Sequence, residues 1–284
     1  RTNPGAEWGG LGAIASGGEL ARFALALKAA LASRGGENAT GPVMIFDEVD
    51  QGVGGAVCAR LATAGLHVYA VGRTAERVES LAADIRNSGG AATAIVADTS
   101  EPAQVARVFQ QIAQGGQPLE IMVFNAAERN IPKPFLEMTP EYIENLWRVG
   151  CFAGFLAGHE ALRAMLPNGR GTLIFTGASA SMRGRAKFAG FASAKAGLRA
   201  FAQSMAREFG PKGIHVAHVV IDGLVAGDRI RSFGAGVGQA LLWSKGEDGT
   251  LDPDAIAEAF WQVHAQPKSA WTHELDLRPF KEEF

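Results

Sequence analysis

The amino-acid sequence predicts an α/β fold: a doubly wound parallel sheet in a single domain, preceded by a helical extension. From residue 42 onward, short apolar runs alternate with segments in which apolar residues repeat at helical intervals. This alternation, with right-handed crossovers between strands, is typical of a parallel sheet covered by helices on both faces. The chain has 284 residues, of which 47% are hydrophobic, so one large domain fits better than two small ones.

The first forty residues differ in character from the rest of the chain. Ser16 and Glu19 have the spacing of a capping box, in which a serine caps a helix and a glutamate reaches back to the capping residue's amide. The apolar residues that follow at helical intervals are Leu20, Phe23, Leu27 and Leu31. We therefore expect a helix from about 20 to 33. We divide the chain into an N-terminal extension, residues 1–41, and an α/β domain, residues 42–284.

The α/β domain is expected to begin with a strand, because Val43-Met44-Ile45-Phe46 is a short apolar run suited to burial on both faces of a sheet. Gly65 and Gly89-Gly90 end the first two helices of the domain. Further strands are expected at 67–71, 92–97, 119–124, 172–176, 215–221 and 271–277. Helices are expected at 54–64, 75–87, 102–113, 140–166, 188–209 and 253–264.

Composition and charge argue against several classes of function. The formal net charge of −2 gives no broad basic field for nucleic acid or anionic lipid, and no run of about 18 apolar residues suits a membrane span. Cys58 and Cys151 are too few for a disulfide framework, so we expect two buried thiols in the reducing cytoplasm. The six histidines show no metal-ligand spacing, and we expect no metal site. His215 and His218 flank a predicted strand, where structural or surface roles are favoured.

Small, polar or charged residues follow each of the first four predicted strands, at the ends where doubly wound sheets bind ligands. They are Gly52-Val53-Gly54, Arg73, Asp98 and Asn125-Ala126, in strand order. Glycines let the backbone approach a pyrophosphate, whose charge is held by amides at a helix N-terminus. A basic residue after the second strand pairs with the 2′-phosphate of NADP(H), whereas an acid there suits the free ribose hydroxyls of NAD(H). Arg73 therefore favours NADP(H) over NAD(H).

Two later motifs, Phe191-x-x-x-Lys195 and Ile221-Asp222-Gly223, complete a series of six. In order and spacing, the series resembles the short-chain dehydrogenase/reductase family from about residue 42 to residue 284. The resemblance implies a Rossmann-type domain that transfers hydride between NADP(H) and a carbonyl or alcohol substrate, a small molecule that these residues do not identify.

The resemblance also implies roles for particular residues. Asp98 stands where the family has an acid against the adenine ring, and Lys195 where it has a lysine that holds the ribose and lowers the pKa of a neighbouring acid/base. The long helix at 140–166 is the one that packs against a second subunit in the family. Phe152, Phe155 and Leu156 lie on it, so a homodimer or homotetramer is expected.

The glycine motif departs from the family's pattern at one position. Glu48 stands four residues before Gly52, where the family has its first glycine. A carboxylate about 4 Å from a phosphate costs roughly 4 kcal/mol at an effective dielectric constant of about 20. We therefore expect Glu48 to weaken cofactor binding unless its side chain swings outward or Mg²⁺ bridges the two anions.

The catalytic positions depart further. The family's tyrosine, serine and helix asparagine are replaced by Phe191, Ala178 and Gly150. Lys195, and Ser179 next to the serine position, remain as the candidate catalytic residues. Because general acid–base catalysis is worth about 10²–10⁴-fold, a non-catalytic Rossmann module that binds a nucleotide or a partner is the alternative to an active oxidoreductase.

Residues 1–60 resemble a different family, the C-terminal half of the RecN DNA-repair ATPases. Ser16-Gly17-Gly18-Glu19 resembles an ABC-type signature, and Asp47-Glu48 resembles the end of a Walker B strand. No Gly-x-x-x-x-Gly-Lys-Ser/Thr sequence occurs to cradle the β- and γ-phosphates of ATP. The two resemblances imply a chimera, and an ATPase fragment is the last-ranked function.

Overall fold

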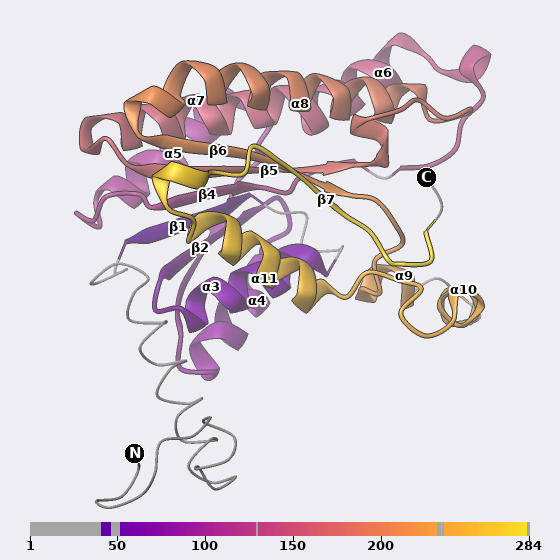
Figure 1. Cartoon of the computed structure of the whole chain (residues 1–284), viewed down its shortest axis with the longest axis horizontal. Coiled ribbons are helices and arrows are strands. Elements are labelled where there is room, and N and C mark those ends of the chain that lie inside the picture. Colours follow the sequence, from indigo (N-terminus) through magenta and orange to yellow (C-terminus); the bar gives the residue numbers. More distant parts are fainter. Residues whose placement is uncertain (1–40, 47–51, 129, 232–233, 235, 283–284) are drawn as a thin grey trace, which may run out of the picture. The chain divides into compact units, whose positions relative to one another are not determined.

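The computed structural model describes residues 41–46, 52–128, 130–231, 234 and 236–282. Seven parallel strands form one sheet in the order β3-β2-β1-β4-β5-β6-β7 (Figure 1). The strands are β1 Pro42–Phe46, β2 His67–Gly72, β3 Ala91–Val96, β4 Ile121–Phe124, β5 Gly171–Ala178, β6 Ile214–Ile221 and β7 Glu274–Leu277. This order is that of a doubly wound Rossmann-type sheet, which confirms the predicted fold class.

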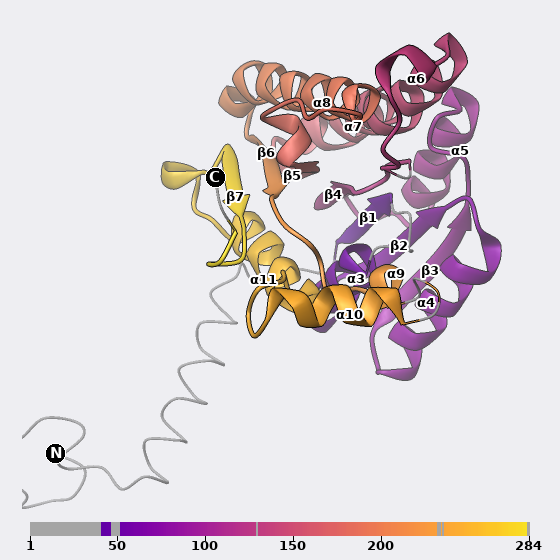
Figure 2. The ribbon, with the colours of Figure 1, turned by 90° about the vertical axis from the view of Figure 1, so that its right-hand side faces the viewer.

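Helices cover both faces of the sheet. In Figures 1 and 2, α5, α7 and α8 lie over one face, while α3, α4 and α11 lie over the other. The principal helices are α3 Val53–Thr63, α4 Ala75–Asn87, α5 Pro102–Ala113, α6 Pro140–Trp147, α7 Ala153–Met165, α8 Ala189–Phe209, α9 Asp228–Arg231, α10 Val237–Lys245 and α11 Pro253–His264. Burial on both faces explains why the central strands are continuous apolar runs rather than alternating ones.

The centre of the sheet is densely apolar. Met44 of β1, Phe124 of β4 and Phe175 of β5 are completely buried, and the rings of the two phenylalanines lie 6.4 Å apart between centroids. Burying one such side chain contributes roughly 1.5–3 kcal/mol. On the inner side of α7, buried Ala153 and Ala157 are small enough for the helix to lie close to the sheet.

The parallel register brings the predicted site segments to one edge of the sheet. Phe46 pairs with Phe124, and Phe124 pairs with Phe175, so β1, β4 and β5 reach their carboxyl ends side by side. The segments that follow these strands therefore meet at this carboxyl edge. The amino ends of the strands lie at the opposite edge.

Most predicted elements are confirmed, with three differences. The helix expected at 140–166 is α6 and α7 joined by a π-helical turn, Arg148–Phe152; such a turn accommodates an extra residue within a helix. The strands expected from 119 and 271 begin later, at Ile121 and Glu274. Helices α9 and α10 were not predicted, because the segment around them is rich in glycine and carries no clear apolar period.

Other predictions fall partly outside the structure. The helix expected at 20–33 and most of the N-terminal extension lie outside the described residues.

Cys58 and Cys151 are buried thiols, as expected. Within the described part of the chain, no helix combines the length and the apolar run that crossing a membrane requires.

Candidate functional site

Gly52 has a backbone conformation that favours glycine. Gly52 immediately precedes α3 and has a φ of 80°, a conformation that residues with a Cβ rarely adopt. Gly52 offers no side-chain cap, and the first turn of α3 contains no acidic residue. Val53 and Gly54 are buried behind it. The amides at the start of α3 therefore suit a bound anion. Asp47 and Glu48 lie outside the described residues, so the effect of Glu48 stays a prediction.

Arg73 follows β2 directly and forms an ion pair across the carboxyl edge. Its Nη2 lies 3.1 Å from Oε1 of Glu128, in the loop after β4. The side chain of Arg73 is 42% exposed, so its guanidinium is accessible to a ligand. Glu128 was not singled out in the sequence.

Asp98 follows β3 and fixes the turn into α5. Its Oδ1 accepts hydrogen bonds from the amide and the hydroxyl of Ser100, at 2.8 and 2.7 Å. Its own amide donates to Oε1 of Gln104 at 2.9 Å. These contacts give Asp98 a structural role, and its expected place against an adenine ring stays a prediction.

Asn125 and Ala126 follow β4 at the centre of the carboxyl edge. Both are buried, and β4 lies between β1 and β5. The two residues therefore lie between the carboxyl end of β1 and that of β5, the strand that Ser179 follows.

Lys195 is the buried cation of the site. It projects from α8, is only 3% exposed, and its Nζ donates a hydrogen bond of 2.9 Å to the carbonyl of Thr176 near the end of β5. Phe191 lies one helical turn earlier, and Nζ of Lys195 is 6.0 Å from the centre of its ring. At these two positions α8 therefore presents an ammonium and an apolar ring that has no proton to donate.

Two neutral groups lie within the electrostatic influence of Lys195. Burial, and then the charge of Lys195, lower the pKa of His218 to about 4. Burial raises the pKa of Cys151 to about 11, although Lys195 opposes that shift. At neutral pH the imidazole and the thiol are both uncharged. His218 is completely buried, which excludes a surface role for it.

The two serines after β5 have different environments. Ser179 opens the 3-10 turn Ser179–Ser181 and is half-buried, which leaves it accessible to a ligand. Ser181 is buried and its Oγ accepts a hydrogen bond of 3.1 Å from the amide of Ala178. Ser181 therefore supports the turn, and Ser179 remains the candidate for contact with a substrate.

Asp222 joins three segments at the end of β6. It is only 2% exposed, and its Oδ2 lies 3.2 Å from Nη2 of Arg183 and 3.1 Å from Nη2 of Arg278. Its amide donates to the carbonyl of Leu277 at 2.8 Å. Asp222 thus ties the segment after β5 to the end of β7. The motif Ile221-Asp222-Gly223 was recognised in the sequence, but its ion pairs were not predicted.

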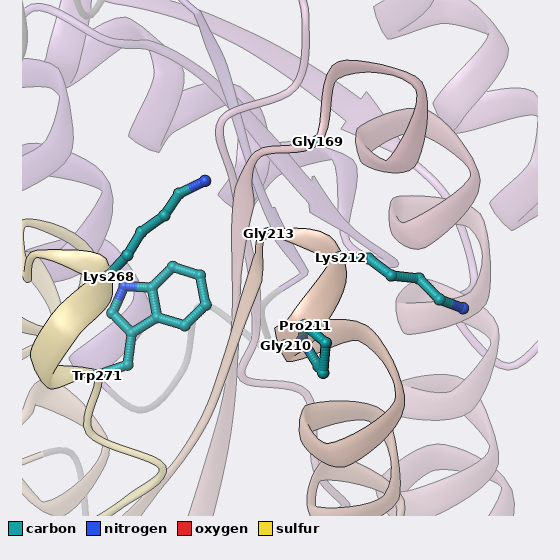
Figure 3. A pocket seen from close by; sticks show the side chains of 7 residues that line it. All are labelled: Gly169, Gly210, Pro211, Lys212, Gly213, Lys268 and Trp271. Carbon is teal, nitrogen blue, oxygen red and sulfur yellow. The ribbon is translucent and has the colours of Figure 1, made fainter.

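A surface pocket of about 420 Å³ lies at the opposite edge of the sheet (Figure 3). Gly169 and Gly213, in its wall, stand just before β5 and β6, so the pocket borders the amino ends of these strands. Figure 3 shows Lys268 and Trp271 close together on one side of it, with Lys212 directed away. Its lining residues are Gly169, Gly210, Pro211, Lys212, Gly213, Lys268 and Trp271. None of the predicted site residues lines it.

Among the described residues, no group of three His, Cys, Asp or Glu is placed to hold a metal ion.

Comparison with known proteins identifies the family. A family model described as short chain dehydrogenase matches residues 48–231. The chain is 32% identical over 178 residues to a short chain dehydrogenase/reductase of Colletotrichum higginsianum, an alignment that covers 62% of this chain and just under two thirds, 66%, of the relative. A solved short-chain dehydrogenase of Rhodopseudomonas palustris is 36% identical, with a TM-score of 0.70 over 84% of this chain and 99% of that one.

A more distant structure has the same fold. An actinorhodin polyketide ketoreductase solved with NADPH superposes with a TM-score of 0.76 at 18% identity, over 84% of this chain and 96% of that one. The resemblance of residues 1–60 to RecN ATPases stays a prediction, and residues 1–40 and 47–51 lie outside the described residues. Four observations indicate the same family: the sheet order, the positive φ of Gly52 before α3, the buried Lys195 and the family-model match over residues 48–231. The chain therefore belongs to the short-chain dehydrogenase/reductase family.

Proposed function

We propose that the chain is an NADP(H)-dependent oxidoreductase that transfers hydride between the cofactor and a carbonyl or alcohol substrate. The observation that carries this proposal is the buried Lys195, whose Nζ donates to the carbonyl of Thr176 at the carboxyl edge. Burial of an ammonium is costly, and in this family the lysine of the motif holds the cofactor's ribose.

The residues of the carboxyl edge fit a nicotinamide dinucleotide. The amides at the start of α3, behind Gly52, would hold the pyrophosphate, and the accessible guanidinium of Arg73 would pair with a 2′-phosphate. Asn125 and Ala126 would line the site between them. Lys195 would donate to the ribose. When bound, the cofactor supplies the hydride.

The chain's own residues supply only part of the usual proton chemistry. The Ser179 hydroxyl is accessible and can donate a hydrogen bond to a substrate oxygen, while Lys195 provides positive charge nearby. Phe191 can do neither. The proton that the substrate oxygen needs on reduction therefore comes from water, and we expect turnover slower than that of a tyrosine-containing relative by about 10²–10⁴-fold.

Phe191 also favours a second candidate function, dinucleotide binding without turnover. In this case the site holds NADP(H) as a structural or sensing ligand. The two functions share the binding step and differ in whether hydride leaves the cofactor.

Titration with NADPH tests both candidates. We expect the nicotinamide fluorescence of NADPH to report binding in the micromolar range, tighter than that of NADH. Lys195→Met is expected to weaken binding at least tenfold, whereas the matched surface variant Lys212→Met leaves it unchanged. Oxidation of the bound NADPH by a panel of aldehydes and ketones separates the oxidoreductase from the non-catalytic module. If the unmodified chain binds neither dinucleotide, both candidates are wrong.

A ladder of aromatic side chains supports self-association. Phe152 of the π-helical turn stacks between Trp147 and Phe155, at 5.6 and 6.1 Å between ring centroids, and Phe155 contacts Phe201 of α8 at 5.6 Å. Trp147 and Phe155 remain about 40% exposed, which is unusual for adjacent aromatic rings on a water-facing surface. We propose that this ladder is covered by a second copy of the chain, in a homodimer or homotetramer.

A further inference from the structure

We propose that Glu128 is a specificity residue for the cofactor, and that its carboxylate opposes the 2′-phosphate and moderates the preference for NADP(H) that Arg73 creates. The inference rests on the proposed function, because it concerns the same dinucleotide site. It adds a determinant of NADP(H) against NAD(H) that comes from a different strand than Arg73.

The ion pair between Arg73 and Glu128 joins segments that follow two strands on either side of β1. Arg73 follows β2 directly, and Glu128 is the fourth residue after β4. In the sheet β1 lies between these two strands (Figure 2). The contact of 3.1 Å between Nη2 and Oε1 therefore crosses the carboxyl end of β1. A dinucleotide held at Gly52 would meet both members of the pair.

The pair responds in opposite ways to the two dinucleotides. A guanidinium binds a phosphate with several charge-assisted hydrogen bonds. Any phosphate that contacts Arg73 also comes within a few ångströms of the Glu128 carboxylate, which already contacts the same guanidinium. The free 2′-hydroxyl of NAD(H) has no charge and can donate a hydrogen bond to a carboxylate. Glu128 is therefore unfavourable for NADP(H) and neutral or favourable for NAD(H).

The size of the effect follows from distance and exposure. Repulsion between two unit charges about 4 Å apart changes a binding constant about fivefold in water and about a thousandfold at a dielectric constant of about 20. The side chains of Arg73 and Glu128 are 42% and 23% exposed, so solvent screens much of the repulsion. We expect the charge of Glu128 to weaken NADPH binding about tenfold.

A purely structural role for Glu128 predicts the opposite change in NADPH affinity when its charge is removed. If the carboxylate served only to orient Arg73, removing its charge would loosen the guanidinium and weaken NADPH binding. The direction of the change therefore separates the two roles.

The test compares dissociation constants of NADPH and NADH for the full chain, for Glu128→Gln and for Glu208→Gln. Glu208 is exposed on α8, so its variant has the same change in net charge at a remote place. We expect Glu128→Gln to bind NADPH about tenfold more tightly, with NADH binding changed less than threefold, and Glu208→Gln to match the unmodified chain. The gain is expected to shrink as ionic strength rises, because the pair is partly exposed.

Two results would overturn the inference in distinguishable ways. In the first, Glu128→Gln and the unmodified chain both bind the dinucleotides, and the ratio of the NADPH and NADH dissociation constants is the same in both or shifts towards NADH in the variant. Glu128 then has no such role, and the proposed function stands. If neither protein binds either dinucleotide, the proposed function fails and the inference fails with it.

Discussion

We expect His218 to make the stability of the fold sensitive to acid, and a variant without this imidazole tests that expectation. The imidazole lies on β6 and is completely buried, with no hydrogen-bond partner for either ring nitrogen among the described residues. The ring also packs against the neighbouring strand, because a Cβ added to Gly177 would lie 2.3 Å from its Nε2. A proton added to His218 would place a charge in this closed space.

The charged groups around His218 do not relieve that cost. Lys195, Arg199 and His273 disfavour its protonated form, and Glu274 favours it. Glu274 is held by Arg199 through hydrogen bonds of 2.7 and 2.8 Å, and these bonds lower the pKa of Glu274 to about 2. Its charge is therefore largely compensated by Arg199 before His218 titrates.

The magnitude and the sign follow from the two pKa values of His218. The pKa of His218 is about 4 in the folded chain, against 6.5 for an ordinary histidine. Between pH 6.5 and pH 4 the unfolded chain therefore binds a proton at His218 that the folded chain does not bind. Stability is unaffected above about pH 6.5 and is lost as the pH falls from there towards 4. The full difference is roughly 3 kcal/mol, and about 2 kcal/mol of it is lost between pH 7.5 and pH 5.

Urea unfolding of the unmodified chain and of His218→Leu at pH 7.5 and pH 5 measures this contribution. Between the two pH values, the variant is expected to lose about 2 kcal/mol less of its free energy of unfolding than the unmodified chain. The comparison is a difference within each protein, so a general change in stability cancels. His159→Gln, at an exposed histidine of α7, serves as the control. Equal acid losses in the variant and the unmodified chain would refute the reasoning.

Two further predictions concern Phe191 and the aromatic ladder. Phe191→Tyr places a phenol beside Lys195 and is expected to raise the rate of carbonyl reduction by at least about 10²-fold with little change in NADPH affinity. Phe188→Tyr, three residues earlier, is the control. An unchanged rate in Phe191→Tyr contradicts the assignment of position 191. Phe155→Glu is expected to convert a dimer or tetramer to a monomer in sedimentation velocity, because it introduces charge where rings stack. The exposed variant Leu136→Glu should leave the assembly intact, and an unmodified chain that is already monomeric would disprove the role of the ladder.

The sequence was informative about the fold because local patterns determine most of it. Apolar runs such as Val43-Met44-Ile45-Phe46 are too short for helices and too uniform for a one-sided sheet, so they indicate buried parallel strands. Gly65 and Gly89 have positive φ values at the ends of α3 and α4, as their stop signals suggested. The π-helical turn Arg148–Phe152 has no comparable local signal, since it depends on how the long helix packs against α8.

The candidate site was predictable where the chain itself carries the pattern. Gly52, Arg73, Asn125 and Lys195 each stand at a fixed place relative to a strand or helix, and the parallel order of the strands brings them to one edge. The ion pair of Arg73 with Glu128 joins residues 55 positions apart, and no periodicity connects them.

The ion pairs of Asp222 form only when three separate segments meet. The acid follows β6, while its partners Arg183 and Arg278 lie after β5 and after β7. An acid at the end of a strand is a signal of a ligand or an ion pair, but its partner is set by tertiary structure.

The combination of Lys195 with Phe191 indicates which step of the family's chemistry this site can support. Replacing a buried ion by an apolar side chain is often neutral or stabilising for a fold, so a lysine that is 3% exposed is a poor choice for stability alone. In the proposed function, Lys195 places its ammonium at the carboxyl edge, where the ribose of the dinucleotide would bind. Phe191 removes proton donation but leaves that ammonium and the glycine turn before α3 in place. In the proposed function, cofactor binding and proton transfer therefore depend on different residues of α8, and we expect the phenylalanine at position 191 to reduce proton transfer far more than cofactor binding.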